Sequence, residues 1–165
     1  MKNDELKDNF IKYFGEEKWN QEETLAVLFK EEFKLCDYLG IEPIPVITDT
    51  IEEDSRYYIE ENYIVISDKL ILDKTEALKC LIHELRHCYQ FNCVRNNVDN
   101  DLVKIWKEEF ANAHLIEYGA MTTELDAFAF TKYIMKEWYN INIVFPDIVY
   151  DEILTRYINK YFINK

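Results

Sequence analysis

The sequence predicts an α+β protein that is mainly helical, with a small antiparallel sheet packed on a central helix. Turn-forming residues are scarce, since the 165 residues include only three glycines and three prolines. Long stretches space their apolar residues as helices do, and only a short region is rich in β-branched and aromatic residues. Because this length falls within the usual range of one domain, residues 1–165 are expected to form a single domain.

Two helices are expected first, from about Asn3 to Phe14 and from about Gln21 to Leu39, because both stretches repeat apolar residues every three or four positions. The segment from Ile41 to Thr50 should be extended, since each of its prolines biases the preceding residue away from helix. Two β-branched and aromatic runs follow, RYYIE and NYIVIS, separated by a short polar turn around Glu61 and Asn62. These runs predict an antiparallel hairpin.

The central helix is expected from about Lys74 to the mid-90s. Asp73 can cap its first amides, and Glu76, three residues later, can reach back toward the cap as in a capping box. Residues 141–145, INIVF, are expected to be a short strand or merely extended. Further helices are predicted at three places, which are Leu102–Glu117, Thr123–Tyr139 and the residues after Pro146.

The formal net charge is −13, from 32 acidic and 19 basic residues. Such a surface repels phosphate backbones, so direct nucleic-acid binding is not expected, and a macromolecular partner should be neutral or basic. One alternative stays open, in which the acidic chain mimics nucleic acid and inhibits a nucleic-acid-binding protein. The simpler interpretation is that the charge keeps the protein in solution.

The first residues, MKNDELKDNF, lack the apolar segment of a signal peptide, and no apolar run approaches the roughly 18 residues that cross a bilayer. The protein is therefore expected to be cytoplasmic, with no membrane contact. Its four cysteines form no CxxC pair, which favours free thiols in a reducing compartment. They are Cys36, Cys80, Cys88 and Cys93.

The sequence HELRH in the central helix is the motif that points to chemistry. His83 and His87 are four residues apart, so both imidazoles leave the same face of the helix and can bind one Zn²⁺. Glu84 lies about 100° further round, where its carboxylate can take a proton from a zinc-bound water. The histidines point away from the main apolar stripe of the helix, which favours a cleft or an exposed surface over the core.

A catalytic zinc usually has three protein ligands and leaves one position for water. We expect Glu124 to be the third ligand, in a helix that Thr122 or Thr123 can cap, with the small Ala127 one turn later. Asp126 is about 200° round the helix from Glu124, so the two carboxylates cannot both face one metal ion.

Two other residues compete for the role of third ligand. His114, the only other histidine, would complete a three-histidine site, although a surface or interhelical position is the simpler interpretation. Cys93 stands where the pattern HExxHxxGxxH has its last ligand. Gln90 replaces the glycine of that pattern, so the helix is expected to run straight on and carry Cys93 away.

On these residues the chain resembles zincin-like metallopeptidases of the gluzincin type, in particular the ImmA/IrrE-like proteins and the small metallopeptidases of phages and mobile elements. The resemblance covers about Tyr57 to Tyr133 and rests on the segments YYIEENYIVIS, CLIHELRHCYQ and ELDAFAF. It implies a zinc-dependent endopeptidase in which Glu84 is the general base and Glu124 of an ExxA motif completes the site. The implied substrate is a specific protein or peptide, such as a basic DNA-binding regulator.

Two positions depart from that family pattern. Arg86 is charged where the motif usually has an uncharged residue, and Phe128 stands where relatives carry an Asn or Asp that supports a histidine. The support is then expected from Asp126 or a backbone carbonyl. The donor to the transition state is left open, with Tyr118 and Tyr133 among the candidates. A catalytically degenerate zincin that acts by binding is the second functional hypothesis, and the acidic inhibitor is the third.

Overall fold

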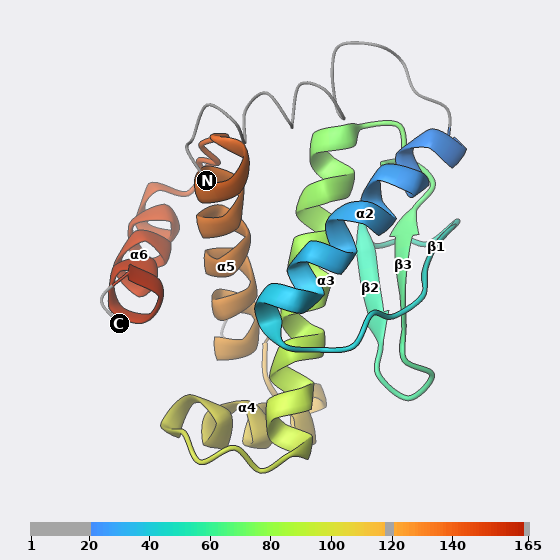
Figure 1. Cartoon of the computed structure of the whole chain (residues 1–165). Helices are drawn as coiled ribbons and strands as arrows, with labels where there is room; N and C mark the ends of the chain where they lie inside the picture. The colour runs from blue at the N-terminus through green and yellow to red at the C-terminus, as the bar shows by residue number, and fades with distance from the viewer. Residues whose placement is uncertain (1–20, 118–120, 164–165) are drawn as a thin grey trace.

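The computed structural model describes residues 21–117 and 121–163, so the helix expected at residues 3–14 lies outside the described part. The described chain is α+β and mainly helical, as predicted (Figure 1). Its strands are β1 (Val46–Asp49), β2 (Ser55–Tyr58) and β3 (Tyr63–Ser67). Its helices are α2 (Gln21–Leu39), α3 (Lys74–Arg95), α4 (Asp101–Ala111), α5 (Thr122–Tyr139) and α6 (Ile148–Ile158), with a 3₁₀ turn η1 (Ala113–Leu115) and a π-helical segment η3 (Asn159–Ile163).

Helix α3 lies at the centre of the arrangement (Figure 1). It packs against α2 and the strands β2 and β3 on one side, against α5 on the other, and against α4 near its end. Helix α6 covers the outer face of α5. The central helix is thus in contact with α2, the hairpin, α4 and α5, and its residues can meet groups from both sides.

The sheet is mixed, which corrects the prediction of an antiparallel sheet. Strands β2 and β3 form the expected antiparallel hairpin, with Asn62 in the left-handed conformation (φ 58°) that asparagine tolerates in tight turns. Strand β1 pairs in parallel with β3, so the order is β1-β3-β2. The short link at residues 50–54 reverses the chain into β2, and the hairpin then returns β3 between the two earlier strands. Strand β2 is left at one edge of the described sheet.

The start of α3 is capped, but only in one direction. The side chain of Asp73 accepts a hydrogen bond from the Glu76 N–H at 3.1 Å, as predicted. The reciprocal half of the capping box is absent, because the Glu76 carboxylate binds Lys79 and the Asp73 N–H donates to the Leu70 carbonyl. The Glu76 carboxylate, which the sequence pattern assigns to the cap, therefore pairs with Lys79 instead.

Helix α4 ends at Ala111, six residues before the predicted Glu117. Asn112 stops it, since its side-chain amide donates to the Glu108 carbonyl at 2.9 Å and so competes with continued helix. The predicted ends of α3 and α5 agree with the structure to within a residue or two. Residues 141–145 form no strand.

The main core joins α2, the sheet, α3 and α5. The apolar stripe of α3 lies in this core, where Leu78, Leu81, Ile82 and Leu85 are fully buried. All four cysteines are buried free thiols, as predicted, and burial raises the pKa of Cys36 and of Cys80 to about 12. None of the described helices combines the length and the apolar composition that a bilayer crossing requires.

Candidate metal centre

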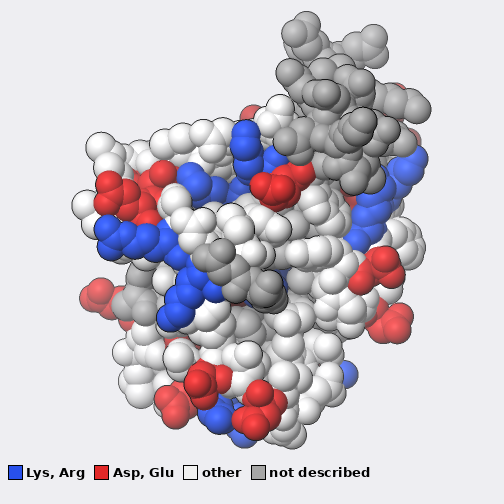
Figure 2. Space-filling view, turned by 60° about the vertical axis from the view of Figure 1, so that its left-hand side comes forward, with Lys and Arg blue, Asp and Glu red and all other residues white. Residues whose placement is uncertain are grey.

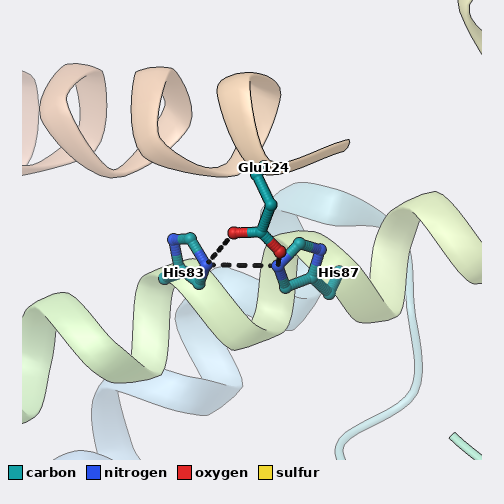
Figure 3. Close-up of side chains that lie close together, drawn as sticks. All are labelled: His83, His87 and Glu124. Atoms are coloured by element: carbon teal, nitrogen blue, oxygen red, sulfur yellow. Dashed lines mark hydrogen bonds and ion pairs between the residues drawn. The ribbon is translucent and has the colours of Figure 1, made fainter. Parts of the chain in front are cut away.

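The two histidines of α3 and Glu124 from the first turn of α5 point toward one another (Figure 3). His83 Nε2 lies 3.1 Å from His87 Nε2, His87 Nε2 lies 2.9 Å from Glu124 Oε1, and His83 Nε2 lies 3.2 Å from Glu124 Oε2. Ligand atoms about 2.05 Å from a tetrahedral zinc are themselves about 3.3 Å apart. The three groups therefore need only small movements to accept such an ion.

The chemistry of these donors fits a divalent cation. Two imidazole Nε2 atoms that face each other cannot bond to each other unless one carries a proton, whereas a cation between them binds both lone pairs. Glu124 Oε2 is buried and has no well-aligned hydrogen bond to any described residue. Two imidazoles and one carboxylate form a known ligand set of catalytic zinc, with a fourth position left for water.

Electrostatics also couple the three groups. Burial disfavours the charged form of His87, but the hydrogen bond and the negative charge of Glu124 outweigh it and raise the pKa of His87 to about 9. Burial would likewise raise the pKa of Glu124, yet its contacts with His83 and His87 hold this pKa far below its usual range. A carboxylate and an imidazolium thus face each other, and a cation can take the place of the proton.

Glu84, the predicted base, lies beside this cluster but does not belong to it. It is buried on α3, and its Oε1 accepts a hydrogen bond of 2.7 Å from the Ser55 hydroxyl on the edge strand β2. One oxygen of the carboxylate is therefore held at β2. This placement agrees with a role beside the metal and not as its ligand.

A cleft of about 700 Å³ opens between β2, α3 and the start of α5, and all four predicted site residues line it. Part of its wall is aromatic. The Phe128 ring packs on the His83 ring with centroids 4.5 Å apart, and Phe145 packs edge-on against Phe128. Phe128 thus fixes the plane of His83 by ring packing, at the position where the family pattern has a polar residue.

The polar support of His87 comes from Gln90. In the sequence this residue stands out only because it replaces the glycine of the pattern HExxHxxGxxH. Gln90 is fully buried, and its Oε1 lies 2.9 Å from His87 Nδ1. Asp126, the expected support, does not bond to His87 but accepts a hydrogen bond from the Gln90 amide. The position of Gln90 three residues after His87, one helical turn away, was the available sequence clue.

The start of α5 is capped from a distance. The N-cap residue of α5 is Met121, and no side chain of Thr122 or Thr123 caps the helix. This corrects the prediction that one of the two threonines is the cap. Glu109 of α4 accepts hydrogen bonds from the Thr122 and Thr123 N–H groups at 2.9 and 2.8 Å, and from the Thr123 hydroxyl at 3.1 Å. Helix α4 thereby holds the turn that presents Glu124.

The competing residues lie away from the cluster. His114 is exposed on η1, and Cys93 is buried in a small cluster with Val103 and Trp106 of α4. Tyr133 packs against Phe162 instead of lining the cleft, and Tyr118 lies outside the described residues.

One tyrosine near the site was missed by the sequence analysis. Tyr150 of α6 packs against Phe128 and Phe145, both of which line the cleft. Burial and the negative charge of Glu124 raise the pKa of Tyr150 to about 12, so its hydroxyl keeps its proton at neutral pH.

No family model matches this chain. Likewise, no curated protein and no solved structure matches it. The resemblance to zincin-like peptidases therefore rests on the sequence motifs alone.

Proposed function

We propose that this protein is a zinc-dependent endopeptidase with a minimal zincin-like fold. The observation that carries the proposal is the convergence of His83, His87 and Glu124, with donor atoms 2.9 to 3.2 Å apart, beside Glu84 in an open cleft. Zinc bound by these three residues would polarise a peptide carbonyl and acidify a water molecule.

Within this proposal each side chain has a separate task. Glu84 accepts the proton of the attacking water and passes it to the leaving amine. Ser55 holds the Glu84 carboxylate in place through its 2.7 Å hydrogen bond. Phe128 and the other apolar residues of the wall keep bulk water from the reacting groups.

The proposed substrate is an extended stretch of a protein or peptide. Strand β2 is an edge of the described sheet and borders the cleft, so a substrate strand can pair with its free backbone groups. Phe128, Phe145 and Phe110 offer contacts to a large apolar side chain. The charge of −13 favours a basic partner, for which a DNA-binding regulator is the example that we propose.

The acidic-inhibitor hypothesis requires a continuous negative surface. Figure 2, which brings the α5 and α6 side of the molecule forward, shows Lys and Arg side chains interspersed with Asp and Glu over this face. Mixed signs on this face do not favour imitation of a phosphate backbone. The degenerate-zincin hypothesis differs from ours only in the absence of catalysis, so a cleavage assay separates the two.

Replacement of Glu84 by Gln tests the proposal directly. The variant should keep its zinc, since Glu84 is not a ligand, and should lose cleavage by about 10²- to 10⁴-fold, since the proton acceptor is gone. Zinc content is measured by elemental analysis, and cleavage of a pool of unstructured peptides is followed by mass spectrometry.

Glu76→Gln is the matched control, because Glu76 lines the same cleft on the same helix. This variant should cleave peptides as fast as wild type does. Equal cleavage by Glu84→Gln and wild type would exclude Glu84 as the base. A wild-type protein that binds one zinc ion per chain but cleaves no peptide would favour the degenerate-zincin hypothesis.

A further inference from the structure

The buried amide of Gln90 has only one orientation that satisfies its hydrogen bonds. One end of the amide faces two acceptors, the Thr123 carbonyl at 2.9 Å and the Asp126 carboxylate at 2.7 Å. This end must be the NH₂ group, because neither partner can donate. The oxygen then faces His87 Nδ1, which must carry a proton and donate to it at 2.9 Å. A neutral His87 therefore keeps its lone pair on Nε2, the atom that faces His83 and Glu124.

Asp126 is fixed in turn by three further donors. Arg86 binds it with two nitrogens, at 2.6 and 3.0 Å, and the Tyr157 hydroxyl donates to it at 2.8 Å. The carboxylate is fully buried, and both of its oxygens accept hydrogen bonds from these donors. The orientation of Gln90 is thus set by a rigid network that joins α3, α5 and α6.

The same side chain also spans the two elements that supply the metal ligands. Gln90 is one turn from His87 on α3, and its two acceptors, Thr123 and Asp126, flank Glu124 on α5. Its hydrogen bonds therefore fix the separation between the second and the third ligand. No other described side chain both contacts a ligand histidine through its outer nitrogen and binds the first turn of α5.

We propose that Gln90 is a positioning residue of the metal centre, which holds His87 as the Nδ1–H tautomer and ties the Glu124 turn to the histidine helix. This inference rests on the proposed zinc site. Gln90 would take over the support of a ligand histidine that the family pattern assigns to an Asn or Asp at the position of Phe128. Zinc affinity would then depend on a residue that does not touch the ion. Loss of such an outer hydrogen bond typically weakens metal binding by about 10- to 100-fold.

Zinc affinity of three variants, measured by competition with a chromophoric chelator, tests the proposal. Gln90→Met keeps the length of the side chain but no acceptor, and should weaken zinc binding by about 10- to 100-fold. Gln90→Glu keeps an acceptor opposite His87 but has no NH₂ group for Thr123 and Asp126, so it should bind zinc less tightly than wild type and more tightly than Gln90→Met. Tyr139→Phe removes a buried hydrogen bond to Glu31 at the end of α5 far from Glu124, and should lose stability but not zinc affinity.

A cobalt-substituted protein gives a readout that general destabilisation does not change. The Nδ1–H proton of His87, shifted by the paramagnetic ion, should exchange slowly with solvent in wild type and Tyr139→Phe, and rapidly in Gln90→Met. Should Gln90→Met not fold, Gln90→Asn replaces it, because it keeps an amide that is too short to reach His87.

Wild-type zinc affinity in folded Gln90→Met or Gln90→Asn would overturn the role of Gln90, as would an affinity of Gln90→Glu no higher than that of Gln90→Met. A wild-type protein that binds no zinc would instead overturn the metal site itself, and the role of Gln90 with it.

Discussion

At the scale of single residues, the charge state of His87 depends strongly on its surroundings. Its ring is bonded on one side to Gln90 and on the other to Glu124, and the carboxylate raises its pKa from 6.5 to about 9. Zinc coordination requires the neutral ring, so the ion and the Nε2 proton compete for the same lone pair.

This competition predicts how the stability of the metal-free protein depends on pH. Since the folded-state pKa of His87 lies above its ordinary value, the folded state binds this proton more tightly than the unfolded state does. The resulting stabilisation should be complete below about pH 6.5 and lost as the pH rises through about 9. Urea unfolding of chelator-treated protein between these pH values measures it.

His87→Gln is the control for this titration, since its free energy of unfolding should fall less over the same range. An equal fall in the variant and in wild type would show that other groups cause the dependence.

Arg86 illustrates why a motif position can be misjudged from sequence. In the sequence it is only a departure from the family pattern, but in the structure it lies buried over the rings of Tyr89 and Phe130 and pairs with Asp126. The partner is 40 residues away, and nothing in the local sequence indicates the pairing. By contrast, the spacing of His83 and His87 follows from helix geometry alone, and so it could be predicted.

At the scale of secondary-structure elements, α4 acts as a support for the start of α5. The buried Glu109 carboxylate satisfies two of the N–H groups that a helix leaves unpaired at its first turn. Glu124 belongs to that turn, so its position depends on a helix that contributes no ligand.

Glu109→Ala should therefore reduce both stability and zinc affinity. Loss of a helix cap costs about 0.5–2 kcal/mol, and the freed turn presents Glu124 less firmly. Urea unfolding and zinc titration measure the two effects. The exposed neighbour Glu108 provides the matched control, since Glu108→Ala should change neither quantity measurably. Unchanged zinc affinity in a destabilised Glu109→Ala protein would limit Glu109 to a structural role.

The elements themselves were largely predictable, because periodic apolar spacing and local caps determine most of them. The hairpin and helices α2, α3, α5 and α6 are found where the sequence places them. The mixed sheet was not predictable in the same way, since the parallel pairing of β1 with β3 depends on how a short link directs the chain. The distant cap by Glu109 was not predictable either, since Glu109 lies on another helix, 14 residues before Thr123.

At the scale of the whole molecule, a bound ion should stabilise the fold, because its proposed ligands join two helices, α3 and α5, that pack against each other. Zinc at about a thousand times its dissociation constant should contribute about 4 kcal/mol. For a chain of this size the melting temperature should rise by about 8–16 °C. Scanning calorimetry with zinc and with a chelator measures the difference.

Two variants decide which residues carry this effect. Glu124→Ala should abolish the zinc-dependent shift and the bound zinc, whereas His114→Ala should keep both, since His114 is exposed and outside the cluster. The reverse result would make His114 the third ligand.

The order of the contributing residues along the chain has a consequence for synthesis. His83 and His87 leave the ribosome well before Glu124, and Tyr157, which steadies Asp126, emerges later still. A nascent chain halted after α4 has only two of the three donors, so it should capture an ion weakly and release it readily. Metal loading is then expected as a late, post-translational event, after the carboxyl-terminal helices have docked.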